Sequence, residues 1–126
     1  MTADIMRYEG PRDLADLTAR RPVLFLAEPK AAERFWEFFT VNIRNRNTRR
    51  AYYTAVCRFS AWCEGRGLPA LTRVKPMHVA AFIEELGRTR SKPTVKQSLA
   101  ALRMLCDWLV VGHIIDVNPA HAVRGP

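Results

Sequence analysis

Residues 47–63 have the sequence NTRRAYYTAVCRFSAWC, and this stretch decides the fold. Asn47 is a good N-cap residue, and Gly65 and Gly67 mark the end of the helix that the stretch predicts. Apolar side chains recur at the i, i+3, i+4 and i+7 spacing of an amphipathic helix: Tyr52, Ala55, Val56, Phe59, Trp62 and Cys63. The stretch therefore predicts a helix with one apolar stripe.

A second face of the same predicted helix is basic. No acidic residue occurs between Ile43 and Glu64, whereas a soluble surface helix normally mixes charges of both signs. The members of this face lie at i, i+4 and i+8 or directly beside that row: Arg49, Arg50, Tyr53, Thr54 and Arg58. A face of one sign on a surface helix indicates an anionic partner.

Apolar periodicity predicts three further main helices, over residues 30–42, 76–86 and 93–112. We also expect a short helix around residues 120–123. The positions expected in the core of the three main helices are Phe35, Phe38, Phe39 and Asn42; Val79, Phe82, Ile83 and Leu86; and Val95, Leu99, Leu102, Leu105, Cys106 and Leu109. With no convincing strand and no internal repeat, the predicted fold class is all-α, with four main helices joined by short turns.

Length and charge narrow the kind of protein further. A chain of 126 residues is one domain by size, and 48% hydrophobic residues are enough for a compact core. The net charge of +8 is concentrated in residues 44–103, which hold 13 basic and 3 acidic residues. This balance predicts a partner that is nucleic acid, anionic lipid or an acidic protein.

Several classes of protein are disfavoured by the sequence. No apolar stretch approaches the roughly 18–20 residues of a membrane span, and no signal peptide is evident, so we expect a cytoplasmic protein. Cys57, Cys63 and Cys106 all fall in predicted helices without CxxC spacing, which predicts small buried thiols. The three histidines show no metal-ligand spacing. We expect no metal, no cofactor and no small-molecule ligand.

Three motifs, in order and at the expected separations, resemble the N-terminal core-binding domain of phage-integrase-type tyrosine recombinases. The resemblance covers residues 30–126. The first motif matches the second helix of that domain, the next matches the start of its fourth helix, and the last matches its close: Thr48-x3-Tyr52-x6-Phe59-x2-Trp62-Cys63; Pro93-Thr94-Val95-x3-Leu99-x2-Leu102-Arg103; and Trp108-Leu109, Gly112, Ile115 and Asn118-Pro119-Ala120.

The resemblance implies a SAM-like four-helix bundle that forms one half of a C-shaped clamp around duplex DNA. It implies that residues 30–124 bind DNA and that residues 125–126 begin an interdomain linker. Residues 1–29 lie outside the resemblance, and we interpret them from their own sequence as an N-terminal arm or a loosely docked extension. In the family, neighbouring protomers touch on DNA, and a separate domain supplies the tyrosine nucleophile and an arginine–lysine–histidine–arginine set. We therefore expect this chain to be non-catalytic and its full-length parent to be a tyrosine recombinase.

One motif in this sequence matches the spacing of part of that catalytic set. His121-Ala-Val-Arg124 has the family's His-x-x-Arg spacing, but it directly follows the Asn-Pro-Ala close, and no tyrosine occurs after Tyr53. We interpret it as linker. Tyr52, on the apolar stripe, and Tyr53, on the basic face, are not expected to be nucleophiles either, so no catalytic residue is predicted.

The predicted DNA-binding elements are the starts of two helices, at residues 47–50 and at residues 92–97. Basic side chains there neutralise phosphates, and helix N-termini favour anions. Gln97 could read adenine, whereas Arg103 could either bind phosphate or pack its stem against the core. The tryptophans are expected in the core. The candidate DNA-binding residues are Arg46, Thr48, Arg49, Arg50, Tyr53, Arg58, Arg90, Lys92, Thr94, Lys96, Gln97 and Arg103.

Two alternative functions stay open at this stage. A helical protein–protein adaptor would need an exposed apolar patch, for which the cluster Phe35, Trp36, Phe38 and Phe39 is the candidate. A standalone basic protein would occupy recombination sites without cutting them. The basic faces themselves also have a plain explanation, which is that they are simply solvated.

Overall fold

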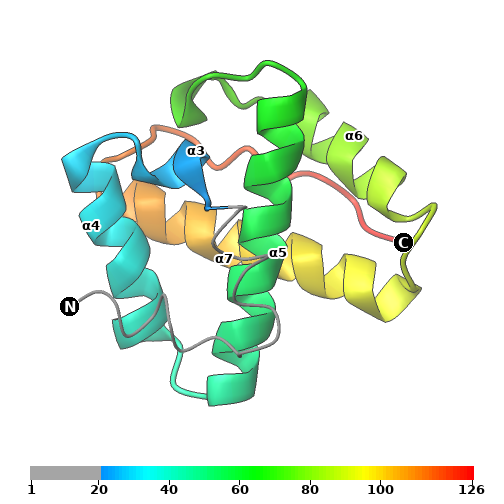
Figure 1. Ribbon diagram of the computed structural model, residues 1–126, viewed down its shortest axis with the longest axis horizontal. Helices are drawn as coiled ribbons and strands as arrows, with labels where there is room; N and C mark the ends of the chain where they lie inside the picture. Colours follow the sequence, from blue (N-terminus) through cyan, green and yellow to red (C-terminus); the bar gives the residue numbers. More distant parts are fainter. Residues whose placement is uncertain (1–20) are drawn as a thin grey trace.

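The computed structural model describes residues 21–126, and no strand occurs within that range (Figure 1). The all-α prediction, with four main helices, is confirmed. The elements are α3 (Val23–Leu26), α4 (Pro29–Glu37), the π-helix η2 (Phe38–Asn42), α5 (Arg46–Gly65), the 3₁₀-helix η3 (Leu71–Arg73), α6 (Pro76–Leu86) and α7 (Lys92–Val111). The N-terminal arm predicted from the sequence lies, up to residue 20, outside the described residues.

Helix α5 crosses in front of α7 at the centre of the molecule, with α4 on one side and α6 on the other (Figure 1). All predicted core positions of α6 and α7 are buried. On α5, Ala55, Val56, Phe59 and Cys63 are buried, while Tyr52 and Trp62 pack at the rim of the core. Apolar periodicity therefore identified the packing faces of these helices correctly.

Helix α5 also buries a second stripe that the sequence did not predict. Tyr53, Cys57 and Ser60 lie at i, i+4 and i+7, and all three are buried. The Ser60 hydroxyl accepts a hydrogen bond from the backbone N–H of Leu24 at 3.1 Å. Because α5 is central, other elements pack against it on two sides. Its polar residue Ser60 therefore forms a contact between α5 and α3.

The assignment of residues 21–29 to a loosely docked extension is wrong. Helix α3 buries Leu24 and Phe25, and the Phe25 ring stacks on Phe35 with centroids 5.4 Å apart. The apolar run between Pro22 and Pro29 is too short to show a helical period. Its place in the core comes from tertiary contacts with α4 and α5.

The helix predicted over residues 30–42 changes its form at Phe38. The π-helix η2 follows α4 without a break, and its wider turn shifts the register of the side chains by about one residue. Phe35, Phe38 and Phe39 are buried as predicted, but Asn42 is exposed and Ile43 is buried in its place. The prediction of a single helix over residues 30–42 had assumed the same α-helical period throughout.

The chain after α7 lacks the short helix predicted around residues 120–123, where the backbone instead forms turns. Gly112 caps α7, but the left-handed residue is His113, with φ 62°. A Cβ atom at Gly112 would lie 2.2 Å from Nε of Arg34. A side chain at Gly112 would therefore displace the Arg34 guanidinium, whereas the backbone of Gly112 itself is not left-handed.

Candidate nucleic-acid interface

Two helix starts form the candidate interface, and each has a side-chain cap. In α5 the Asn45 side chain accepts from the Thr48 backbone N–H at 2.9 Å, so the cap is Asn45 rather than the predicted Asn47. In α7 the Ser91 hydroxyl accepts from the Thr94 backbone N–H at 3.4 Å. The first turn of neither helix contains an acidic residue. Both helix dipoles therefore present uncompensated positive ends to an anion.

Figure 1 shows the start of α5 at the lower edge of the molecule and the start of α7 at the lower right. At the α5 start, Arg46 and Arg50 are exposed and Thr48 is half-buried. The candidates around the α7 start are exposed except for the half-buried Thr94: Arg90, Lys92, Thr94, Lys96 and Gln97. Most of the predicted interface is therefore accessible, in two groups at the starts of crossing helices.

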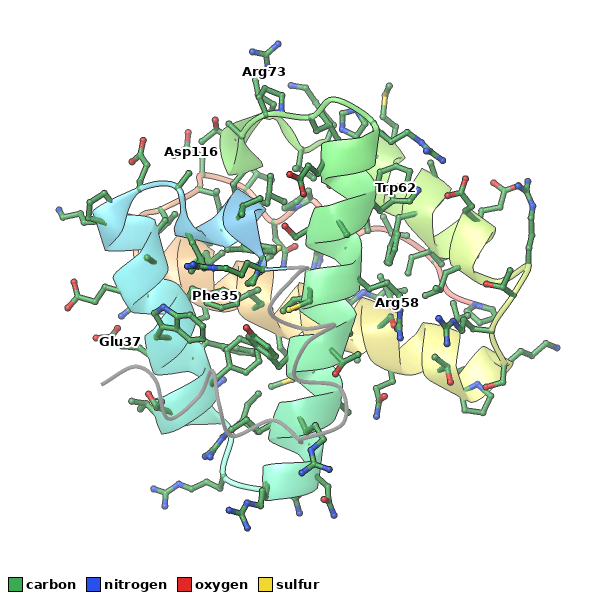
Figure 2. All side chains as sticks on the ribbon, viewed as in Figure 1. Phe35, Glu37, Arg58, Trp62, Arg73 and Asp116 are labelled. Atoms are coloured by element: carbon green, nitrogen blue, oxygen red, sulfur yellow. The ribbon has the colours of Figure 1, made fainter. Side chains whose placement is uncertain are left out.

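Arg58 lies between these two groups. Figure 2 shows it on the part of α5 that passes α7, and its side chain is half-buried. Because α5 and α7 pack against each other, Arg58 lies on α5 where the two helices cross.

Arg49 has a structural task within this region. Its guanidinium donates a hydrogen bond to the backbone carbonyl of Ile43 at 2.7 Å, which closes the turn between η2 and α5. The side chain is half-buried. Replacing Arg49 would therefore disturb the turn as well as the charge.

The placement of Tyr53 on the exposed basic face is wrong. Tyr53 is 3% exposed, and its ring lies 5.5 Å from the Phe39 ring and 6.0 Å from the Trp36 ring, centroid to centroid. The cause is the second buried stripe of α5, which faces α3 and α4. Tyr53 therefore supports the core and is not accessible to DNA.

Arg103 binds the protein's own backbone. Its Nε donates to the carbonyl of Ala120 at 3.2 Å, and one of its terminal nitrogens donates to the carbonyl of Val123. The amide of Asn118 in turn donates to the Arg103 carbonyl at 3.0 Å. Of the two roles left open by the sequence, contact with the protein itself is the one that these bonds support, through the guanidinium rather than the stem.

The acidic residues of α6 are neutralised locally. Glu85 accepts hydrogen bonds from Nε1 of Trp62 at 2.6 Å and from Arg66 at 2.5 Å, and Arg66 also lies over the Trp62 ring. Glu84 pairs with Arg88 at 3.7 Å. These pairs reduce the repulsion that α6 would exert on a phosphate backbone next to the α7 start.

Other kinds of site find little support in residues 21–126. No group of three or more potential metal ligands occurs among them, and no described helix is long and apolar enough to cross a membrane. The three cysteines are free and buried, as predicted. Burial raises the pKa of Cys63 and of Cys106 to about 12, so both thiols stay protonated and weakly nucleophilic at neutral pH.

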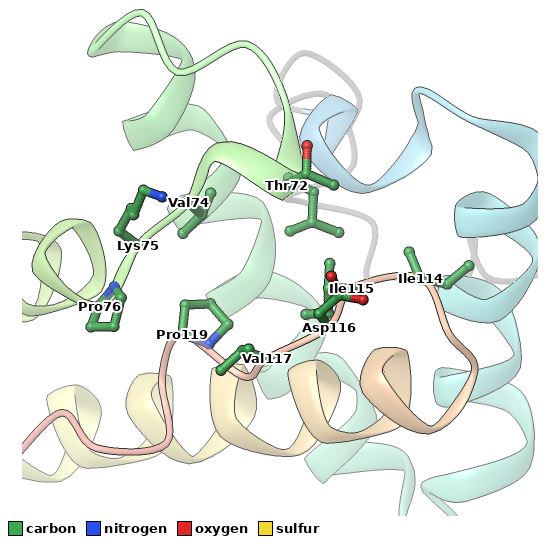
Figure 3. A pocket seen from close by; sticks show the side chains of 10 residues that line it. Thr72, Val74, Lys75, Pro76, Ile114, Ile115, Asp116, Val117 and Pro119 are labelled. Atoms are coloured by element: carbon green, nitrogen blue, oxygen red, sulfur yellow. The ribbon is translucent and has the colours of Figure 1, made fainter.

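The apolar patch expected for an adaptor is not where the sequence placed it. Phe35, Phe38 and Phe39 are each 0% exposed, and only Trp36 of that cluster reaches the surface. Figure 3 shows a different apolar groove of about 410 Å³, between the segment around η3 and the chain that follows α7. Val117 on its edge is 73% exposed.

The two helix starts, with exposed basic side chains and no acidic residue in their first turns, favour an anionic partner. The family model for the phage integrase N-terminal SAM-like domain matches residues 32–112, which is more than half of the chain. The chain therefore belongs to this family, as its motifs indicated. Neither a search of curated proteins nor a search of solved structures found a match.

Proposed function

We propose that this chain is the DNA-gripping domain of a site-specific tyrosine recombinase, in which it forms one half of a clamp around duplex DNA. The observation that carries the proposal is the pair of helix starts, at Arg46 and Lys92, that bear exposed basic side chains and no acidic ones. Membership of the integrase SAM-like family supports the link to recombination.

The chemistry of the proposed contacts follows from the side chains. Arg46, Arg50 and Lys92 neutralise phosphates and release counterions, which supplies affinity that does not depend on sequence. The backbone N–H groups at each helix start add hydrogen bonds to phosphate oxygens, and together the two starts fix the register of the domain on the duplex. Gln97, exposed on the second turn of α7, is suited to reading adenine.

The proposal extends to partners and location. Neighbouring protomers of a recombinase would contact one another on the DNA, and the protein would act in the cytoplasm. The chemistry of strand cleavage would belong to a separate catalytic domain, with no cofactor required of this one.

The direct test is fluorescence anisotropy of the domain on a labelled duplex of about 30 base pairs across a salt series. We expect log affinity to fall by roughly 4 to 7 units per decade of salt, as for several phosphate contacts. Absence of binding at low salt would overturn the proposal.

A double variant and a control variant locate the interface. Lys92→Ala combined with Lys96→Ala should reduce the salt slope by about two units, one for each lost phosphate contact. The control is Lys30→Ala, which removes an exposed lysine from the first turn of α4, on the opposite side of Figure 1. Equal slopes for the double variant and the control would exclude the α7 start from the interface.

The adaptor alternative is favoured only by the groove of Figure 3, whose edge includes the exposed Val117. Val117→Asp would place a charge on that edge and should leave the salt slope unchanged if DNA is the partner of the helix starts. A loss of DNA binding in this variant, with folding retained, would show that the edge of the groove lies at the DNA interface, which would contradict its assignment to a protein partner.

A further inference from the structure

A groove of about 600 Å³ lies where the end of α6, the start of α7 and the C-terminal segment meet. Four basic side chains line it, and all four residues are exposed: Arg88, Arg90, Lys92 and Arg124. Its floor includes the buried side chains of Ile83, Val95 and Val123. The one acidic lining residue, Glu84, is paired with Arg88.

Arg124 reaches this groove because the segment that carries it is fixed to α7. Arg103 holds the carbonyls of Ala120 and Val123, and the Asn118 amide donates to Asp107 of α7 at 2.7 Å. Farther along, a Cβ atom at Gly125 would lie 3.3 Å from the side chain of Leu99, so the backbone there rests on the first half of α7.

Burial confirms that the segment is part of the packed structure. Ala120 is 0% exposed and Val123 is 7% exposed, whereas Arg124 between Val123 and Gly125 is exposed. The result is one exposed guanidinium on a segment that is anchored on both sides. A charge held in this way loses less conformational freedom on binding than a charge on a free tail.

We propose that Arg124 is a phosphate contact of the DNA-binding face and that Arg103 is the positioning residue that holds it there. This inference rests on the proposed function and adds the C-terminal segment to the two helix starts. Basic side chains from three elements around an apolar floor concentrate positive potential, because low-dielectric walls focus the field. A guanidinium also suits the bidentate binding of phosphate oxygens.

The inference gives a use to the His-x-x-Arg motif at residues 121–124. Its arginine lies at the groove, while its histidine is exposed in a turn and takes no part in the proposed contact. The motif is therefore explained by backbone anchoring and phosphate binding rather than by catalysis.

The test is a double-mutant cycle on the salt slope of duplex binding. Arg124→Ala should lower the slope by about one unit. Arg103→Met keeps an unbranched stem of similar length but removes the donors to the two carbonyls, and it should lower the slope by about as much. If Arg103 acts through Arg124, the double variant should lower the salt slope by no more than Arg124→Ala alone does.

Two further variants separate positioning from general damage. Arg103→Lys retains a donor for the carbonyls and should recover most of the slope. Arg73→Ala removes an exposed arginine at the upper edge of Figure 2, away from the groove, and should change nothing. All slopes are compared at a temperature at which circular dichroism shows each variant to be folded.

The possible failures are distinguishable. A wild-type slope retained in Arg124→Ala would overturn this inference and leave the proposed function standing. Additive losses in the double variant would overturn the positioning role, because Arg103 would then bind phosphate itself. Absence of wild-type binding at low salt would overturn the proposed function, and this inference with it.

Discussion

The two ends of α7 both involve basic side chains, and they use them in opposite ways. At the C-terminal end, Arg34 lies over the Trp108 ring at 4.4 Å and donates to the Trp108 carbonyl at 3.4 Å. At the N-terminal end, Arg90, Lys92 and Lys96 are exposed. The same kind of charge is built into the packing at one end and left at the surface at the other.

The physical reason lies in the polarity of the helix. The last turn of a helix offers carbonyl oxygens that accept from a guanidinium, and its dipole attracts a cation. The first turn offers only N–H groups, and its dipole disfavours a cation by roughly 0.3–1 kcal/mol for each charge. Basic residues at the start of α7 therefore oppose the stability of the fold, which is typical of positions kept for a function.

The largest effect on stability is expected from a substitution in the hydrophobic core. Phe59 is 2% exposed and contacts the Phe82 ring with centroids 5.1 Å apart. Phe59→Ala should lower the free energy of unfolding by about 3–5 kcal/mol through lost burial and the cavity left behind. Urea denaturation measures the change, and a loss below about 1 kcal/mol would contradict the packing described here.

The next effect separates the two ends directly. Arg34→Ala removes the contacts with Trp108 and the 3.0 Å ion pair with Glu37, and it should cost about 1–3 kcal/mol of stability without changing the salt slope. Arg90→Ala should do the opposite, with a change in stability within about 0.5 kcal/mol and a slope lower by about one unit.

Both variants are measured by denaturation and by the anisotropy salt series. The comparison between the two ends fails if Arg34→Ala changes the slope or if Arg90→Ala unfolds the domain.

A smaller or similar effect is expected at Gly112. A methyl group there would displace the Arg34 guanidinium, so Gly112→Ala should cost at most about as much as Arg34→Ala, about 1–3 kcal/mol, through the loss of the contacts of Arg34 with Trp108. Gly65 at the end of α5 is the matched control, because a Cβ atom there would meet nothing within 4 Å. Thermal unfolding of the two variants would contradict this reasoning if they lost equal stability.

The smallest effect is a trade between stability and binding at the start of α7. Lys92→Glu places an acid in the first turn and should stabilise the domain by roughly 0.3–1 kcal/mol through the helix dipole. The same change should weaken duplex binding more than Lys92→Ala does, because it adds repulsion to the loss of a contact. Stability and binding that fell together would indicate a structural role for Lys92.

Much of the fold was predictable from the sequence because helix periodicity is a local property. The spacing of Val79, Phe82, Ile83 and Leu86 predicted the buried face of α6, and Pro76 and Gly87 predicted its bounds. The signals that failed were those without a local period. The run in α3 spans a single turn, and the π-helix at residues 38–42 changes the period within one helix.

The candidate site was predictable to a lesser degree. Charge indicated the two basic helix starts, since a cluster of basic residues without acids is visible in the sequence itself, but the cap of α5 is Asn45 rather than the predicted Asn47. Arg88 and Arg124 were not among the predicted contacts, because only the folded chain brings them to the groove beside α7. The spacing of the His-x-x-Arg motif was the one hint of Arg124, and it pointed to a different chemistry.

The sequence by itself determined the fold class, the family and the basic character of the domain, because these depend on composition, period and motif order. Only the tertiary structure decided which basic or aromatic side chains are available to a partner. Tyr53 is buried because α5 is covered from two sides, and Arg103 binds Ala120 and Val123 because the chain returns along α7. The accessibility of a side chain depends on neighbours distant in sequence, which no local pattern records.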